Sequence, residues 1–210
     1  MKELEMTPIV VEQLTKVFRG KKGTQVEALK NLTLTVNQAE IVGFLGPNGA
    51  GKSTTIKTLM GQIRPSSGSA KLFGKDANDS YARQNVGYLP ENPAFYNFLT
   101  AWEYLDLVGC AYGMAKGDIR RESERVLTLL ELSSAANRPI KGFSKGMVQR
   151  LGLAQTLLHD PELFILDEPM SGLDPVGRAL VKKLMLSLKK NGKTVFFSTH
   201  VIADVEAVCD

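Results

Sequence analysis

Residues 46–53 place glycines, a lysine and a serine in the order G-x-x-x-x-G-K-S. Glycine lets a backbone bend tightly and point its N–H groups inward around phosphate oxygens. The pattern follows a short apolar run, 40–45, and precedes residues 52–63, whose apolar side chains recur at helical spacing. A glycine-rich turn without a ligand is the alternative. Because the pattern lies between a strand and a helix, whose dipole also attracts anions, it predicts a nucleotide-binding phosphate loop.

The side chains of this loop have separate expected roles. Lys52 can reach the outer phosphates of a nucleotide, and the hydroxyl of Ser53 can ligate Mg²⁺. The loop motif consists of Gly46, Pro47, Asn48, Gly49, Ala50, Gly51, Lys52 and Ser53.

Two carboxylates follow a second apolar run, residues 163–166. If that run is a buried strand, Asp167 and Glu168 emerge at its carboxyl end, where α/β sheets bind ligands. Asp167 can then hold Mg²⁺ through water, and Glu168 can polarise an attacking water as a general base. A strand that simply ends in surface acids remains the alternative for this segment alone. His200 follows another apolar strand and is expected at the same edge, within reach of a γ-phosphate.

Composition restricts the class of protein. The chain has 210 residues, 43% hydrophobic, with a net charge of +4. These values are typical of globular domains and exclude disordered and fibrous classes. The basic residues are dispersed, so no nucleic-acid partner is predicted. No apolar run approaches the ~18 residues of a membrane span, and the N-terminus resembles no signal peptide. Cys110 and Cys209 are expected to be reduced core residues of a cytoplasmic protein.

The chain that must position these motifs divides into three parts by its pattern of apolar residues. Alternation predicts antiparallel strands at 8–14 and 32–36, and the last third returns to buried strands. Strands that alternate with helices predict an α/β fold with a parallel sheet covered on both faces. The middle part is predicted to be helical, and Ser144 and Asp174 are predicted helix caps. The expected later elements are helices 101–112, 118–132, 144–158 and 175–190 and strands 86–89, 163–166 and 194–199.

Four segments separate this chain from GTPases and kinases. They are 143–150, Leu-Asp-Glu-Pro at 166–169, Ser-Gly-Leu-Asp at 171–174, and His200. In this order the set resembles the ATP-binding cassette of ABC transporters over essentially the whole chain. The resemblance implies one domain, 1–210, with a P-loop NTPase core of mixed sheet (1–90 and 159–210), an N-terminal antiparallel β subdomain and an inserted helical signature subdomain (91–158).

The resemblance also implies roles for individual residues. Glu168, His200 and Lys52 become the catalytic residues, with Glu168 as base and His200 as switch histidine. Phe18 would stack on adenine, and Ser144 and Gly146 would complete the ATP site of an opposing subunit. The remaining phosphate and Mg²⁺ residues it implies are Asn48, Gly49, Gly51, Ser53 and Thr54.

The function implied is an ATPase subunit that uses ATP and Mg²⁺. Two cassettes, in a homodimer or pseudo-dimer, would sandwich two ATP molecules and drive a separate transmembrane permease from the cytoplasmic face of the membrane. A soluble, non-transport ABC ATPase of repair or translation is the alternative, but those types carry long coiled coils or two cassettes. A nucleotide-sensing module is a third possibility, and it would normally lack Lys52 or Glu168, which are both present.

Three departures from the family pattern are visible. Lys145 and Met147 replace the usual Gly and Gln of the signature, and Glu91 stands where a glutamine usually meets Mg²⁺. The chain also stops at Asp210 inside a predicted helix, 201–209, and is expected to be truncated. Similar signatures occur in single-cassette, export-type systems. Residues 93–99 predict either a groove for a membrane subunit or, for Leu99 especially, core packing.

Overall fold

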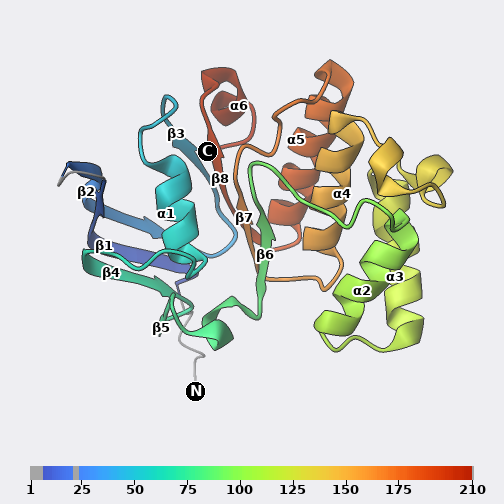
Figure 1. Cartoon of the computed structure of the whole chain (residues 1–210), viewed down its shortest axis with the longest axis horizontal. Coiled ribbons are helices and arrows are strands. Elements are labelled where there is room, and N and C mark those ends of the chain that lie inside the picture. Colours follow the sequence, from blue (N-terminus) through green and yellow to red (C-terminus); the bar gives the residue numbers. More distant parts are fainter. Residues whose placement is uncertain (1–6, 21–23, 210) are drawn as a thin grey trace.

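The computed structural model describes residues 7–20 and 24–209 and contains two four-stranded sheets (Figure 1). The antiparallel sheet has the order β2-β1-β4-β5, and the parallel sheet has the order β3-β8-β7-β6. The strands are β1 (Ile9–Arg19), β2 (Gln25–Val36), β3 (Ile41–Leu45), β4 (Ser67–Leu72), β5 (Lys75–Asp76), β6 (Val86–Leu89), β7 (Leu163–Leu166) and β8 (Thr194–Thr199).

The parallel sheet is buried on both faces, as its apolar strands predict. Alternate side chains of one strand enter different cores, so Phe196 faces one core while Val195 and Phe197 face the other. The first core joins the sheet to α1 (Lys52–Leu59) and the antiparallel sheet. The second joins it to α4 (Lys145–Leu157) and α5 (Pro175–Lys190). Figure 1 shows α1 on one side of the sheet and α4 and α5 on the other.

The helical subdomain continues the second core. It contains α2 (Ala101–Ala111) and α3 (Lys116–Leu129), and its buried leucines pack against α4. Thr100 and Glu103 form a reciprocal capping box at the start of α2, which satisfies two N–H groups of the first turn. Short 3₁₀ helices η2 (Ser80–Arg83), η3 (Ser133–Ala135) and η4 (Ile140–Gly142) complete the connections, and α6 (Ile202–Glu206) lies near the end of the chain.

Several expectations need correction. Cys110 is exposed on α2 rather than in the core, because the apolar face of this helix is formed by other positions; Cys209 is only partly buried. The helix predicted over 52–63 ends at Leu59, and the one predicted over 201–209 covers only 202–206. Strands β4 and β5 were not predicted, since Ser67–Leu72 has few apolar residues. Among the described helices, none has the length and apolar character to cross a bilayer.

Candidate active site

The phosphate loop connects the end of β3 to the start of α1. Gly49 and Gly51 have φ angles of 85° and 92°, in the left-handed region that favours glycine. A Cβ on Gly51 would lie 2.5 Å from the carbonyl oxygen of Ala28 in β2, so the loop lies directly against the antiparallel sheet. The Lys52 ammonium donates to the carbonyls of Gly46 (2.6 Å) and Pro47 (3.1 Å), which folds the loop around the lysine. The sequence pattern therefore produces the expected cradle.

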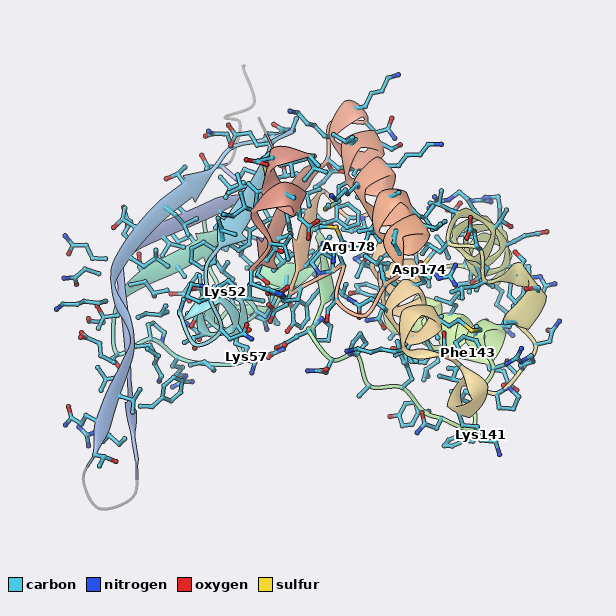
Figure 2. The ribbon with its side chains drawn as sticks, turned by 90° about the horizontal axis from the view of Figure 1, so that it is seen from above. Lys52, Lys57, Lys141, Phe143, Asp174 and Arg178 are labelled. Carbon is cyan, nitrogen blue, oxygen red and sulfur yellow. The ribbon has the colours of Figure 1, made fainter. Side chains whose placement is uncertain are left out.

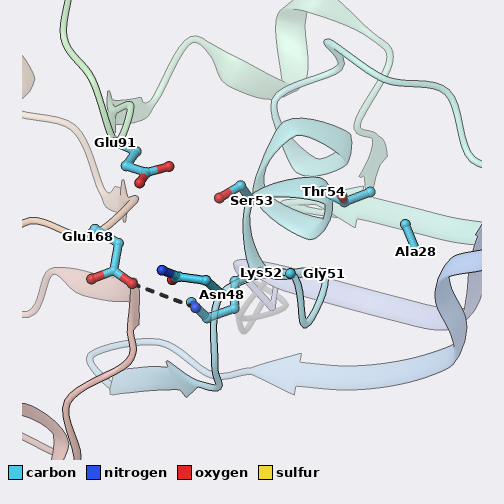
Figure 3. A pocket seen from close by; sticks show the side chains of 9 residues that line it. Ala28, Asn48, Gly51, Lys52, Ser53, Thr54, Glu91 and Glu168 are labelled. Atoms are coloured by element: carbon cyan, nitrogen blue, oxygen red, sulfur yellow. Dashed lines mark ion pairs between the residues drawn. The ribbon is translucent and has the colours of Figure 1, made fainter.

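Beside this loop lies a pocket of about 250 Å³ (Figure 3). It brings residues of four separate chain segments together at the start of α1. Lys52 Nζ lies 3.6 Å from Glu168 Oε1, and both side chains are largely buried. Figure 3 shows Glu91 and Glu168 on the side opposite Ser53 and Thr54. The lining residues are Ala28, Asn48, Gly49, Gly51, Lys52, Ser53, Thr54, Glu91 and Glu168. We call this the phosphate-loop pocket.

The acid pair occupies the carboxyl end of β7, as predicted, but its two members differ. Asp167 is 1% exposed, and it accepts a 2.5 Å hydrogen bond from the Ser198 hydroxyl. The same hydroxyl accepts a 2.9 Å hydrogen bond from the backbone N–H of Glu168. Burial raises the pKa of Tyr88, and the negative charge of Asp167 raises that pKa further. Asp167 thus lies behind the pocket, while Glu168 lines it.

Glu168 has a strained backbone that its neighbours hold in place. Its φ of 50° is left-handed, which costs free energy at a residue other than glycine. The buried Gln149 amide of α4 donates to the carbonyls of Glu168 (3.2 Å) and Pro169 (3.1 Å). His200 Nδ1 lies 3.0 Å from both carboxylate oxygens of Glu168. The carboxylate is therefore oriented from three sides: by Lys52, by His200 and through its own backbone.

The parallel pairing of β7 and β8 explains why Glu168 and His200 meet. Leu166 lies opposite Phe197 in this register, so both strands end at the same edge of the sheet. Sequence reasoning predicted the shared edge and missed the supports, Ser198 and Gln149. Ser198 lies in the fully buried strand β8, where a hydroxyl requires a partner, and that signal was available. Nothing in the sequence pairs Gln149 with the backbone of Glu168, nineteen residues away and just after β7.

The donor set in the phosphate-loop pocket fits Mg²⁺. A hydroxyl from Ser53 and the carboxylate of Glu91 line the same pocket, and oxygen is the donor that Mg²⁺ prefers. Asp167 lies behind this pair, which suits contact through water better than direct ligation. Ser53, Asp167 and Glu91, the three predicted metal residues, thus remain candidates, with Glu91 in place of a neutral amide.

The predicted signature residues lie outside the phosphate-loop pocket. Ser144 caps α4 by accepting a 3.3 Å hydrogen bond from the N–H of Met147. Ser144 and Gly146 line a second pocket, of about 410 Å³, which we call the signature pocket. Its other lining residues are Glu131, Lys145, Arg150, Gly172, Leu173, Asp174, Val176 and Gly177. Figure 2 shows Lys52 well separated from Asp174, which lines this second pocket.

Phe18, the predicted adenine platform, lies on β1 opposite Val26. Its ring is 39% exposed, and the Lys16 ammonium lies 5.1 Å from the ring centroid. Phe18 does not line the phosphate-loop pocket, whereas Ala28 of the neighbouring strand β2 does. Phe18 therefore lies in the antiparallel sheet that borders the phosphate loop, and its ring is partly exposed to solvent.

Residues 29–171 match the family model described as ABC transporter. The chain belongs to the ABC transporter family. An uncharacterised ABC transporter ATP-binding protein of Synechocystis is 48% identical over 94% of this chain and 57% of its own length. The bacitracin transport ATP-binding protein BcrA of Bacillus licheniformis is 39% identical over 97% of this chain and 65% of its own. This chain thus spans less than two thirds of the length of either relative.

Solved cassettes share the fold of this ABC family member. The ATP-binding subunit of an ABC transporter superposes with a TM-score of 0.86 at 33% identity, over 97% of this chain and 84% of the other. A dimeric cassette in a post-hydrolysis state with bound ADP and phosphate gives 0.87 at 25% identity, over 95% and 91% of the two chains. The predicted P-loop NTPase architecture, with its antiparallel and helical additions, is confirmed.

Proposed function

We propose that this chain binds ATP with Mg²⁺ and hydrolyses it, as the nucleotide-binding subunit of an export-type ABC transporter. The observation that carries the proposal is the meeting of Lys52, Glu168 and His200 beside a glycine phosphate loop. Each of these groups has a distinct part in phosphoryl transfer to water. Glycine-rich turns without a ligand have no need of a carboxylate held in a strained backbone opposite a buried lysine.

In the proposed reaction, Glu168 acts as the general base. Its carboxylate takes a proton from a water whose oxygen bonds to the γ-phosphorus, while the bond from that phosphorus to the bridging oxygen breaks and leaves ADP. Lys52 and the N–H groups of the loop bind the phosphate oxygens, and His200 orients Glu168. Ser53 and Glu91 would hold Mg²⁺, with Asp167 behind them contacting it through water, and the bound ion would supply neutralisation of phosphate charge. Phe18 supplies a face for the adenine.

The signature pocket has its proposed role across a dimer. Ser144 and Gly146 lie at the positive end of the α4 dipole, where a helix favours an anion. Because this end is far from the phosphate loop of its own chain, we propose that it binds the γ-phosphate held by an opposing cassette. Two identical chains, or this chain and a similar one, would then enclose two ATP molecules. The dimeric cassettes among the structural relatives support this arrangement.

Substituting Glu168→Gln tests the proposed function. The amide keeps the size of the side chain but cannot accept the proton, so we expect ATP hydrolysis to fall by about 10²-fold or more with ATP binding retained. Size-exclusion chromatography with ATP and Mg²⁺ should then show a stable dimer. Glu124→Gln, on an exposed face of α3, is the matched control. Wild-type turnover in the Glu168 variant would contradict the proposal.

We also propose that residues 93–99 contact the permease on the cytoplasmic face of the membrane. Phe95 packs edge-on against Tyr104, at 4.8 Å between ring centroids, and like Leu99 and Trp102 it is partly buried against the core. Tyr96 and Phe98 form a pair that is 58% and 75% exposed. Two exposed aromatic rings side by side are typical of a protein interaction surface.

Replacing the exposed pair tests this partner surface. Tyr96→Ser with Phe98→Ser should reduce co-purification of the full-length subunit with its membrane protein several-fold, while basal ATPase activity of the isolated subunit stays within about twofold. Tyr81→Ser, which changes another exposed tyrosine on η2, is the control. Unchanged co-purification of the double variant would show that the partner binds elsewhere.

A further inference from the structure

A buried carboxylate next to His200 has no part in the mechanism above. Asp204 of α6 is 2% exposed, and such burial of a charge requires close partners. Arg178 Nη2 lies 2.8 Å from both of its oxygens, and Lys182 Nζ lies 3.1 Å from Oδ1. Both cations come from α5, so Asp204 ties α6 to α5. We call Asp204, Arg178 and Lys182 the α5–α6 clamp.

The clamp also reaches the residue that precedes His200. The Thr199 hydroxyl donates to Asp204 Oδ2 at 3.5 Å and accepts from the N–H of Val201 at 3.1 Å. The carbonyl of Thr199 accepts a 3.2 Å hydrogen bond from the N–H of Gly46, the first residue of the phosphate loop. Residues 199 and 201, on either side of His200, are therefore fixed by a network that ends at Asp204.

The other end of the clamp leads to the loop after Glu168. Asp174 caps the N-terminus of α5, and its side chain accepts a 2.8 Å hydrogen bond from the N–H of Gly177. The N–H of Arg178 bonds to the carbonyl of the same aspartate at 2.9 Å. In Figure 2, Arg178 lies between Lys52 and Asp174. The Asp204 carboxylate thus links two parts of the chain. One is the segment around His200, and the other is α5, which follows the loop after Glu168.

We infer that Asp204 is a positioning residue for the proposed hydrolysis: through Arg178, Lys182 and Thr199 it fixes His200 opposite Glu168. This inference rests on the proposed function. The 3.0 Å approach of His200 to both oxygens of Glu168 requires the two strand ends to keep one relative position. Without the carboxylate charge, Arg178 and Lys182 lose their shared partner, and two cations on neighbouring turns of α5 repel each other.

Substituting Asp204→Asn tests the inference, because it preserves shape and removes charge. We expect kcat for ATP hydrolysis to fall roughly tenfold, while KM for ATP and binding of a fluorescent ADP analogue change less than about twofold. The control is Glu206→Gln, an exposed acid on the same helix, which should leave both parameters unchanged. Parallel thermal melts measure how much stability the variant loses.

A His200→Ala background separates positioning from stability. If Asp204 acts through His200, Asp204→Asn should lower the residual rate of His200→Ala by less than about twofold. An equal fold-loss in both backgrounds, or an unchanged kcat in the single variant, would overturn the inference. Should Asp204→Asn fail to fold, Thr199→Val leaves the Asp204 charge in place, removes the hydroxyl that joins Asp204 to the backbone of Val201, and should show the same dependence on His200. A wild-type chain without ATPase activity would instead refute the proposed function itself.

Discussion

The phosphate-loop pocket and the signature pocket both lie at the N-terminus of a helix, yet they are built differently. The first contains a buried lysine and a carboxylate, Glu168, which several partners hold in place. In the second, Glu131 pairs with Arg150 at 3.2 Å, and the Asp174 side chain caps α5. Both acids there are already engaged. In the proposed function, the first pocket binds ATP and supplies the base, and the second only binds the partner's nucleotide. The different construction of the two pockets is consistent with two halves of one composite site.

The largest effects should come from substituting one residue in each half of the proposed composite site: Lys52 in the phosphate-loop pocket and Gly146 in the signature pocket. Lys52→Ala should abolish nucleotide binding, because the phosphates lose their principal cation. Gly146→Asp should leave ADP binding intact and lower hydrolysis by about 10²-fold, because a carboxylate would face the partner's phosphates. A Cβ on Gly146 meets nothing closer than 3.5 Å, so the variant is expected to fold. Titration with a fluorescent ADP analogue and a phosphate-release assay measure the two outcomes.

Mixing the two variants tests whether the phosphate-loop pocket of one chain and the signature pocket of the other form one ATP site in a dimer. A heterodimer of Lys52→Ala and Gly146→Asp contains one intact site, so an equimolar mixture should recover roughly a quarter of wild-type activity. Gly146→Ala, which adds no charge, should keep most of the activity alone. A mixture that stays inactive would contradict the composite site.

A smaller effect is expected from Glu91, which gives the phosphate-loop pocket a second carboxylate. Glu91→Gln removes a charged oxygen donor, so the Mg²⁺ concentration for half-maximal ATPase activity should rise roughly fivefold. A magnesium titration at saturating ATP measures the change, with Glu124→Gln as the control. Identical titration curves would show that residue 91 is not at the metal.

The sequence predicted the residues that line the two pockets better than the residues that hold those lining residues in place. The phosphate loop, the acid pair and His200 each follow an apolar strand, so their common edge could be inferred from alternation and strand order alone. Ser144 and Asp174 cap α4 and α5 as their residue types predict. These features depend on local patterns, which a single sequence carries.

Features that depend on distant contacts were missed. The hydrogen bonds of Gln149 to residues 168 and 169, and the α5–α6 clamp, join segments that no local pattern relates. Strand β4 forms because β1 offers it an edge, although its own residues, Ser67–Leu72, have weak strand character. The exposure of Cys110 reflects which face of α2 meets α3 and α4, and that depends on tertiary packing.

The smallest expected effect concerns a contact between the nucleotide-binding core and the helical subdomain. His159, just before β7, stacks on Tyr112, just after α2, at 3.7 Å between ring centroids. Burial lowers the pKa of His159 to about 4, below its ordinary value of 6.5. The unfolded chain therefore takes up the proton first, and the folded state loses stability as pH falls from about 6.5 toward 4, with no such loss above that window.

His159→Phe keeps an aromatic ring for the stack and removes the titration. We expect its melting temperature to fall less than that of the wild type between about pH 7.5 and pH 5, because only the wild-type ring gains a proton on unfolding. Tyr112→Phe, which retains His159, should keep the wild-type acid sensitivity. If His159→Phe and the wild type lose equal stability between these pH values, the acid sensitivity of the fold comes from groups other than this histidine.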